Sequence, residues 1–188
     1  MIKITRKLLR AADSCYGAAR EKELIPIKGL TIREVAQLDI PTKDKIWAIC
    51  KASNAPDNTL REFACWCARN ALNTERKAGR EPDPRSWAAV DVAERYARGE
   101  ASKAERTASY RAAFGAASDA ASFAAYYAAY YAANAARNTA CNVASYAAYD
   151  AACGAYYAVF SAASYAPSGS ARRAIRRRQL KKLVNLLS

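Results

Sequence analysis

A long stretch with almost no helix-breaking residue and almost no charge restricts the fold more than any other feature of this sequence. It covers residues 103–165 and is dominated by alanine, the strongest helix former. Between residues 112 and 171 the only charged side chains are Asp119, Arg137 and Asp150. A single helix of this length would extend about 90 Å, which is too long for a compact domain. We therefore expect the stretch to fold back on itself.

A cluster of Asn and Thr residues marks the expected turn of this helical hairpin. Residues 134–142 read NAARNTACN, and such side chains compete with helical hydrogen bonds by binding the nearby backbone. The sequence therefore predicts one helical arm over residues 103–134 and a second arm over residues 140–164.

The arms alternate pairs of alanine with pairs of tyrosine, as in AASFAAYYAAYYAANAA. At about 100° per residue, the aromatic residues of the first arm share an arc of about 140°. They are Phe123, Tyr126, Tyr127, Tyr130 and Tyr131, and the second arm carries a similar stripe of Tyr146, Tyr149, Cys153, Tyr156, Tyr157 and Phe160. The alanine face lets a neighbouring helix approach closely, and the aromatic face supplies buried area. Tyrosines also stack on nucleic-acid bases, but such platforms interleave Arg and Lys, so a core role is favoured.

The remaining helices are predicted from local start and stop signals. Five helix starts have a side chain that can cap the first turn: Thr5, Thr31, Thr42, Asp83 and Ser102. Two of these are followed by glutamate three residues later, which predicts capping boxes with Glu34 and Glu105. Helix ends are expected near Asn54, Gly79 and Gly99. The first helix is expected to run without a break over residues 5–19.

These elements predict an all-α fold: a helical bundle with a long Ala/Tyr-rich helical hairpin and a C-terminal basic helix. The chain has 188 residues, enough for one domain with a sizeable core. We divide it into an N-terminal helical region over residues 1–80, an Ala/Tyr-rich region over 81–170 packed on it, and a basic amphipathic helix over 171–188. Together they are expected to form one compact domain.

The residue types argue against an enzyme and against a metal site. The chain has no histidine, and its six cysteines, at positions 15, 50, 65, 67, 141 and 153, form no C-x-x-C pair. We interpret them as small apolar residues in a reducing cytosol. The sequence also lacks a glycine-rich phosphate loop and a G-x-S-x-G motif. We therefore predict no catalytic residue, no cofactor and no metal ligand.

The charge balance favours an acidic partner. Lys and Arg number 30 against 17 Asp and Glu, which gives a net charge of +13. The first residues lack the apolar region of a signal peptide, and no apolar run is long enough for a membrane span. We therefore expect a cytoplasmic protein with no membrane span, and a homo-oligomer is compatible with this composition.

The C-terminal segment SARRAIRRRQLKKLVNLLS combines basic residues with an apolar stripe. The predicted partner-binding residues are Arg172, Arg173, Arg176, Arg177, Arg178, Lys181 and Lys182, and the stripe consists of Ile175, Leu180, Leu183, Val184 and Leu187. One interpretation is a helix that docks on the bundle, with cations favoured near its C-terminus and a solvated basic face. The others are a helix that binds phosphates or an acidic protein, and a helix attached to a membrane surface. Docking and binding are compatible because they use opposite faces.

Three segments resemble a known family. They are EPDPRSWAAVDVAERYARGEA (residues 81–101), KIWAICKASNAPDNTLREFACWCARNAL (45–72) and ARNTACNVASYAAYDAACGAYYAV (136–159). They are similar to the immunity protein family of polymorphic-toxin loci and its phage relatives, over about two thirds of the chain. The resemblance implies an all-helical, cytosolic binding protein from a conflict system. Family members often carry histidines in the second arm, so a metal or catalytic role there does not carry over to this chain.

The sequence and the resemblance together predict a non-catalytic binding protein. We expect a phage or bacterial immunity or anti-defence protein that binds a protein partner, such as a toxin or a host defence component. The alternative hypothesis is a nucleic-acid-binding accessory protein that uses the basic C-terminal helix. Binding to phosphates weakens steeply with salt, whereas a shape-complementary protein interface changes much less.

Overall fold

The computed structural model describes residues 2–12, 14–77, 79, 81–118 and 169–188. Within these ranges the elements are β1 (Lys3–Ile4), α1 (Arg6–Ala11), α2 (Ala18–Leu24), β2 (Leu30–Thr31), α3 (Ile32–Gln37), α4 (Thr42–Ala52), α5 (Asp57–Lys77), α6 (Pro84–Ala97), α7 (Lys103–Ser118) and α10 (Gly169–Leu187). The predicted all-α class is confirmed. Helix α7 is the first part of the predicted arm over residues 103–134. The rest of that arm, the turn and the second arm lie outside the described residues.

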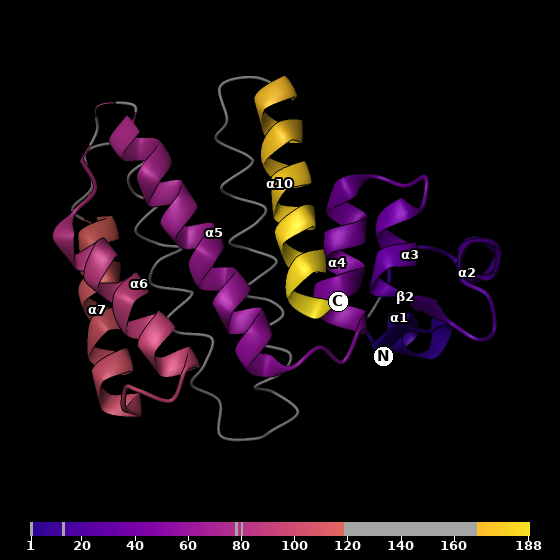
Figure 1. Cartoon of the computed structure of the whole chain (residues 1–188), viewed down its shortest axis with the longest axis horizontal. Coiled ribbons are helices and arrows are strands. Elements are labelled where there is room, and N and C mark those ends of the chain that lie inside the picture. Colours follow the sequence, from indigo (N-terminus) through magenta and orange to yellow (C-terminus); the bar gives the residue numbers. More distant parts are fainter. Residues whose placement is uncertain (1, 13, 78, 80, 119–168) are drawn as a thin grey trace.

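The helices are arranged around α5, the longest helix of the described part (Figure 1). Helix α6 packs against α5 on one side, and α7 packs against α6. On the other side of α5 lies α10, which also packs against α4 and α3. The C-terminal helix therefore joins the N-terminal elements to the centre of the molecule.

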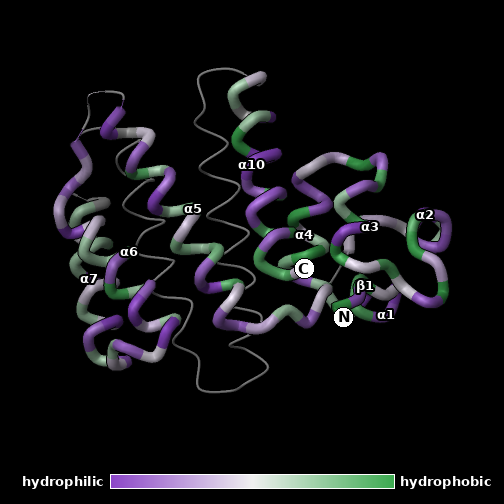
Figure 2. Tube along the Cα trace, in the orientation of Figure 1, coloured by the Kyte–Doolittle hydropathy of each residue, from purple (hydrophilic) through white to green (hydrophobic). Residues whose placement is uncertain are grey.

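The hydrophobic core runs through the interfaces of α4, α5 and α10. Fully buried side chains come from all three helices and include Ile46, Ile49, Phe63, Leu72 and Leu183. Figure 2 shows hydrophobic segments of α4 beside the C-terminal half of α10, in agreement with the contact between these helices. The predicted docking of the last helix on the bundle is thus confirmed.

Most of the predicted helix caps are present. The Thr31 hydroxyl accepts from the backbone of Glu34, whose carboxylate accepts from the backbone of Thr31, so this capping box is complete. The box between Ser102 and Glu105 also has both of its hydrogen bonds. Other predicted signals lie where expected: Thr5 and Asp83 as N-caps, Pro84 in the first turn, and Gly79 and Gly99 with positive φ after their helices.

The prediction of one unbroken helix over residues 5–19 is wrong. Helix α1 ends at Ala11, and α2 starts at Ala18. Between them the Ser14 hydroxyl accepts a hydrogen bond from the backbone N–H of Tyr16, a local bond that replaces helical pairing. The Tyr16 hydroxyl then donates to Asp44 of α4 at 2.7 Å, which holds this connection against the core.

Thr42 is not the cap of α4. Pro41 occupies the N-cap position with extended backbone angles and no side-chain hydrogen bond, and Thr42 is the first residue of the helix. Because proline has no N–H and a fixed φ, it stops the preceding chain from continuing as a helix and so moves the start of α4 by one residue.

A small two-stranded sheet was not predicted. Strands β1 and β2 are antiparallel, with Lys3 opposite Thr31 and Ile4 opposite Leu30. Strands of two residues are too short to show the alternation that identifies a strand in a sequence. Gly29 precedes β2 with φ of +74°, and a Cβ there would lie 2.8 Å from the carbonyl oxygen of Ile4, so the close approach of the two segments requires glycine.

We predict that Leu183→Ala destabilises the protein strongly. Leu183 has no exposed surface, so the substitution removes buried apolar area and leaves a cavity, which costs about 2–5 kcal/mol. The free energy of unfolding from urea titration measures this loss. Leu187→Ala is the matched control, because Leu187 is only partly buried on the same helix. Equal losses for the two variants would contradict the assigned docking face of α10.

Candidate functional site

One face of helix α10 packs against the core of the molecule. Leu183 and Gln179 are fully buried, and Leu180 and Val184 are partly buried beside them. The Gln179 side-chain amide donates to the sulfur of Cys67 on α5 at 3.9 Å, a buried polar contact that the apolar stripe did not predict. Leu187 also packs against the core, whereas Ile175 lies near the start of the helix and is only partly covered.

The opposite face of α10 carries exposed cations. Arg173, Arg177, Arg178 and Lys181 are exposed and fall within an arc of about 140° at 100° per residue. We call these four residues the basic face. No carboxylate in the described part of the chain forms an ion pair with any of them.

The other predicted binding residues lie elsewhere on the same helix. Arg176 is half-buried, and the ammonium of Lys182 lies 3.7 Å from the carboxylate of Glu62 on α5. Arg172 belongs to α10, but its side chain is outside the described part of the chain. The structure therefore brings together four of the seven predicted residues on one exposed surface.

Helix stability does not account for the basic face. The last turn of α10 contains no basic residue, so the expectation that the cations lie near the helix C-terminus is wrong. Arg173, Arg177 and Lys181 are spaced four residues apart, and like charges at this spacing destabilise a helix by a few tenths of a kcal/mol. The spacing of these cations therefore does not stabilise α10.

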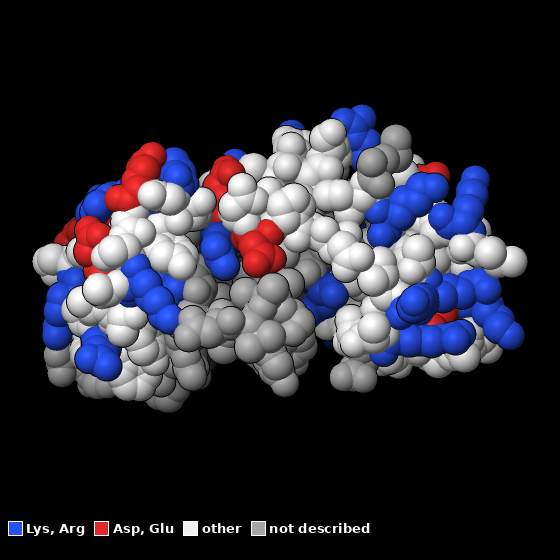
Figure 3. All heavy atoms as spheres, turned by 90° about the horizontal axis from the view of Figure 1, so that it is seen from below, with Lys and Arg blue, Asp and Glu red and all other residues white. Residues whose placement is uncertain are grey.

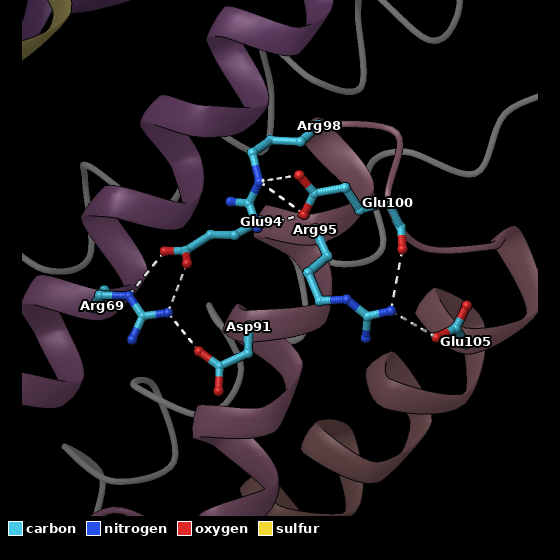
Figure 4. Close-up of polar contacts among 7 residues, drawn as sticks. All are labelled: Arg69, Asp91, Glu94, Arg95, Arg98, Glu100 and Glu105. Carbon is cyan, nitrogen blue, oxygen red and sulfur yellow. Dashed lines mark hydrogen bonds and ion pairs between the residues drawn. The ribbon is translucent and has the colours of Figure 1, made fainter.

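A second polar region connects α5, α6 and α7, and Figure 4 shows its contacts. The guanidinium of Arg69 donates to Glu94 through two nitrogens, both at 2.8 Å, and to Asp91 at 2.6 Å. These hydrogen bonds raise the pKa of Arg69, and the bond to Glu94 makes the largest contribution. The side chains in this region that form hydrogen bonds with one another or with the nearby backbone are Arg69, Asp91, Glu94, Arg95, Arg98, Glu100 and Glu105, which we call the α6 charge network.

A cleft of about 720 Å³ lies beside this network. Its walls are Asn58, Glu62, Trp66 and Arg69 of α5 and Glu94, Ala97 and Arg98 at the end of α6. The charged groups of the cleft are paired: Glu62 with Lys182, Arg69 with Glu94, and Arg98 with Glu100. The described lining of the cleft thus offers an aromatic surface, from Trp66, and paired charges.

One of the three segments that carry the family resemblance, residues 81–101, contains α6 and both of its ends. Asp83 caps the helix and pairs with Arg85, whose guanidinium donates to it at 2.8 Å. At the other end Gly99 has φ of +79°, and Arg98 donates to Glu100 across the turn. These residues therefore have a local structural role at the ends of α6.

The buried cysteines have the properties of core residues. Cys50, Cys65 and Cys67 are buried free thiols, and Cys15 is exposed. Burial raises the pKa of Cys50 and of Cys65 to about 12. No group of three metal-ligating side chains occurs in the described ranges. Cys141 and Cys153 lie outside them.

None of the described helices is long and apolar enough to cross a membrane. Comparison with known proteins found no matching family model, no similar curated protein and no similar solved structure.

We predict that the α6 charge network stabilises the protein above about pH 4.5 and loses this effect in acid. The backbone and hydroxyl of Ser102 lower the pKa of Glu105, and Arg98 lowers that of Glu100, both from a value of 4.5. A carboxylate with a lowered folded pKa stabilises above its unfolded pKa, and this contribution disappears as pH falls through the folded value. Melting temperatures between pH 7 and pH 3 should fall less for the double variant Glu100→Gln and Glu105→Gln than for wild type.

The matched control for this pH series is Asp39→Asn, an exposed residue outside the network. Its melting curve should follow wild type at every pH. If the double variant also runs parallel to wild type, the network does not contribute to acid sensitivity.

We predict that the buried thiols are inert in the native protein. A rise in pKa from 9.0 to about 12 lowers the thiolate fraction of Cys50 and Cys65 about 1000-fold near neutral pH. Brief treatment with iodoacetamide followed by peptide mass mapping should label Cys15 and leave these two unmodified, whereas denatured protein should be labelled at all three. EDTA should not change the melting temperature, and a marked fall would contradict the prediction that the fold needs no metal.

Proposed function

We propose that this chain is a non-catalytic binding protein whose basic face binds an acidic surface of a macromolecular partner. The observation that carries the proposal is the two-sided character of α10. Its apolar side is anchored by the buried Leu183, and its other side presents Arg173, Arg177, Arg178 and Lys181, which form no ion pair with a carboxylate of the described ranges. The cations are thus held on a fixed helix, which reduces the entropy that binding would otherwise cost.

The shape of the basic face favours a protein partner. From Arg173 to Lys181 the face extends about 12 Å along the helix axis, or about two turns. Helix α10 contains no aromatic residue, so it offers no surface on which single-stranded bases can stack. Three of the four residues of the basic face, Arg173, Arg177 and Arg178, are arginines, and Arg176 beside them is half-buried. Arginine pairs with carboxylates in a bidentate geometry.

Other exposed cations, such as Lys7, Lys28 and Lys43, lie on separate N-terminal segments rather than together on one helix face. Figure 3 shows Lys and Arg side chains gathered at the end formed by the N-terminal elements. In the N-terminal elements, Arg6 donates to the backbone of Ile25, and Arg10 donates to the carboxylate of Glu21. The basic face of α10 is therefore the better candidate for a binding surface.

The biological setting is proposed from the resemblance of three segments to the immunity proteins of toxin loci and their phage relatives. We propose an immunity or anti-defence protein of a phage or a bacterium that acts in the cytoplasm on a toxin or a host defence component. The free buried thiols are compatible with a reducing compartment. The second candidate is an accessory protein that binds duplex nucleic acid, because guanidinium groups on one helix face also match a row of phosphates.

The test of this proposal uses two defined anionic probes, a fluorescent 20-base-pair DNA duplex and a fluorescent polyglutamate peptide. Reversing Arg173, Arg177 and Lys181 to Glu should weaken binding of the preferred probe at least 10-fold and leave the melting temperature nearly unchanged, since solvated charges contribute little to stability. For the duplex, the slope of log K against log salt should approach −3 to −4 when four phosphates are contacted. Tighter binding of polyglutamate with a shallow slope supports the protein partner.

The matched control reverses Lys7, Lys28 and Lys43, three exposed cations away from α10, and changes the net charge by the same amount. This control should bind like wild type. If both triple variants lose binding equally, association follows net charge rather than the basic face. If neither probe binds wild type at low salt, the proposal of an acidic partner is wrong.

A further inference from the structure

Two arginines from different helices meet at one tyrosine ring. The guanidinium carbon of Arg106 on α7 lies 4.7 Å from the centre of the Tyr96 ring on α6, and that of Arg61 on α5 lies 5.7 Å from the same centre. Arg106 is 1% exposed and is among the most deeply buried side chains in the described part of the chain. This cluster is separate from the basic face of α10.

The positive charge in this cluster is poorly compensated. Within the described ranges Arg106 forms no ion pair, and its Nη1 atom is buried without a hydrogen-bond partner. Arg61 contacts the carboxylate of Asp57 at 3.7 Å, but its Nε atom is also buried and unpartnered. Burial, and then the positive charge of Arg61, lower the pKa of Arg106. The tyrosine ring offsets only part of the cost of burying two guanidinium groups.

From the two unpartnered guanidinium nitrogens at one ring, we infer that Arg61, Tyr96 and Arg106 form a binding site for a small oxyanion. An oxyanion accepts several hydrogen bonds at once and supplies the negative charge that the cluster lacks. Inorganic phosphate and a small carboxylate share this chemistry. The inference does not depend on the function proposed for α10.

The burial of the two arginines decides what size of ligand fits. Arg106 is 1% exposed, so a small ion is favoured over the surface of a large partner. The Arg61 side chain is 19% exposed and is tied to the surface by one long contact with Asp57, which is itself 35% exposed. Arg61 is therefore the residue that moves to admit the anion, and it exchanges its weak pair for a closer one.

The test is the melting temperature of the whole chain in phosphate, in acetate and in sodium chloride of equal ionic strength. Phosphate in the low millimolar range should raise the melting temperature of wild type by about 2–4 °C over chloride. Acetate distinguishes the two sources of oxyanion: a rise with acetate alone identifies a small carboxylate, and a rise with phosphate alone identifies phosphate.

The variant Arg106→Met separates a binding site from a structural role. It removes the buried charge at similar volume, so without added oxyanion it should melt at or above the wild-type temperature, and it should lose the response to the anion. The control Arg95→Met changes an exposed arginine of the α6 charge network and should keep the response. The inference is overturned if Arg106→Met responds to phosphate and acetate as wild type does, or if wild type responds to neither. It is also overturned if Arg106→Met melts well below wild type in chloride, because Arg106 is then stabilising without a ligand.

Discussion

The packing of α10 on α3, α4 and α5 is the interaction on which the described structure depends. Leu183 fills the core cluster that also contains Ile46 and Phe63, and Gln179 binds Cys67 inside it. The last helix thus completes a core whose other walls come from the first half of the chain. The basic face exists as a fixed surface because the opposite face is anchored in this core.

Arginine occurs in three distinct situations in this molecule. Arg173, Arg177 and Arg178 of α10 are exposed, and the arginines of the α6 charge network are paired with carboxylates. Arg106 is buried and forms no ion pair with a described residue. The first situation suits the proposed contact with a large anionic surface and the third the proposed small anion, whereas the pairs of the second connect α5, α6 and α7. A net charge of +13 therefore does not describe one uniform electrostatic property of the surface.

The sequence predicts well what depends on neighbouring residues. The capping box at Thr31, the cap at Asp83 and the apolar stripe of α10 are each encoded within a few positions, and the structure confirms them. The break after α1 combines a local hydrogen bond from the Tyr16 backbone to Ser14 with a contact between Tyr16 and Asp44, 28 residues away, and a local reading of the sequence does not reach the second. The burial of Arg106 was not predictable either, because in the segment KAERTASYR it has the pattern of a surface residue. Only its position against Tyr96 of another helix shows that it is buried.

The long separation between the two sides of the core affects how the protein is made. Gln179 and Cys67 are in contact but lie 112 residues apart. At a synthesis rate of about 5–20 residues per second, α5 waits roughly 6–20 s for the helix that covers it. During that time the apolar faces of α4 and α5 lack their final cover, and contacts of such sequence separation also form slowly. A nascent chain is therefore exposed to aggregation until α10 is made, and a chain truncated before α10 remains so.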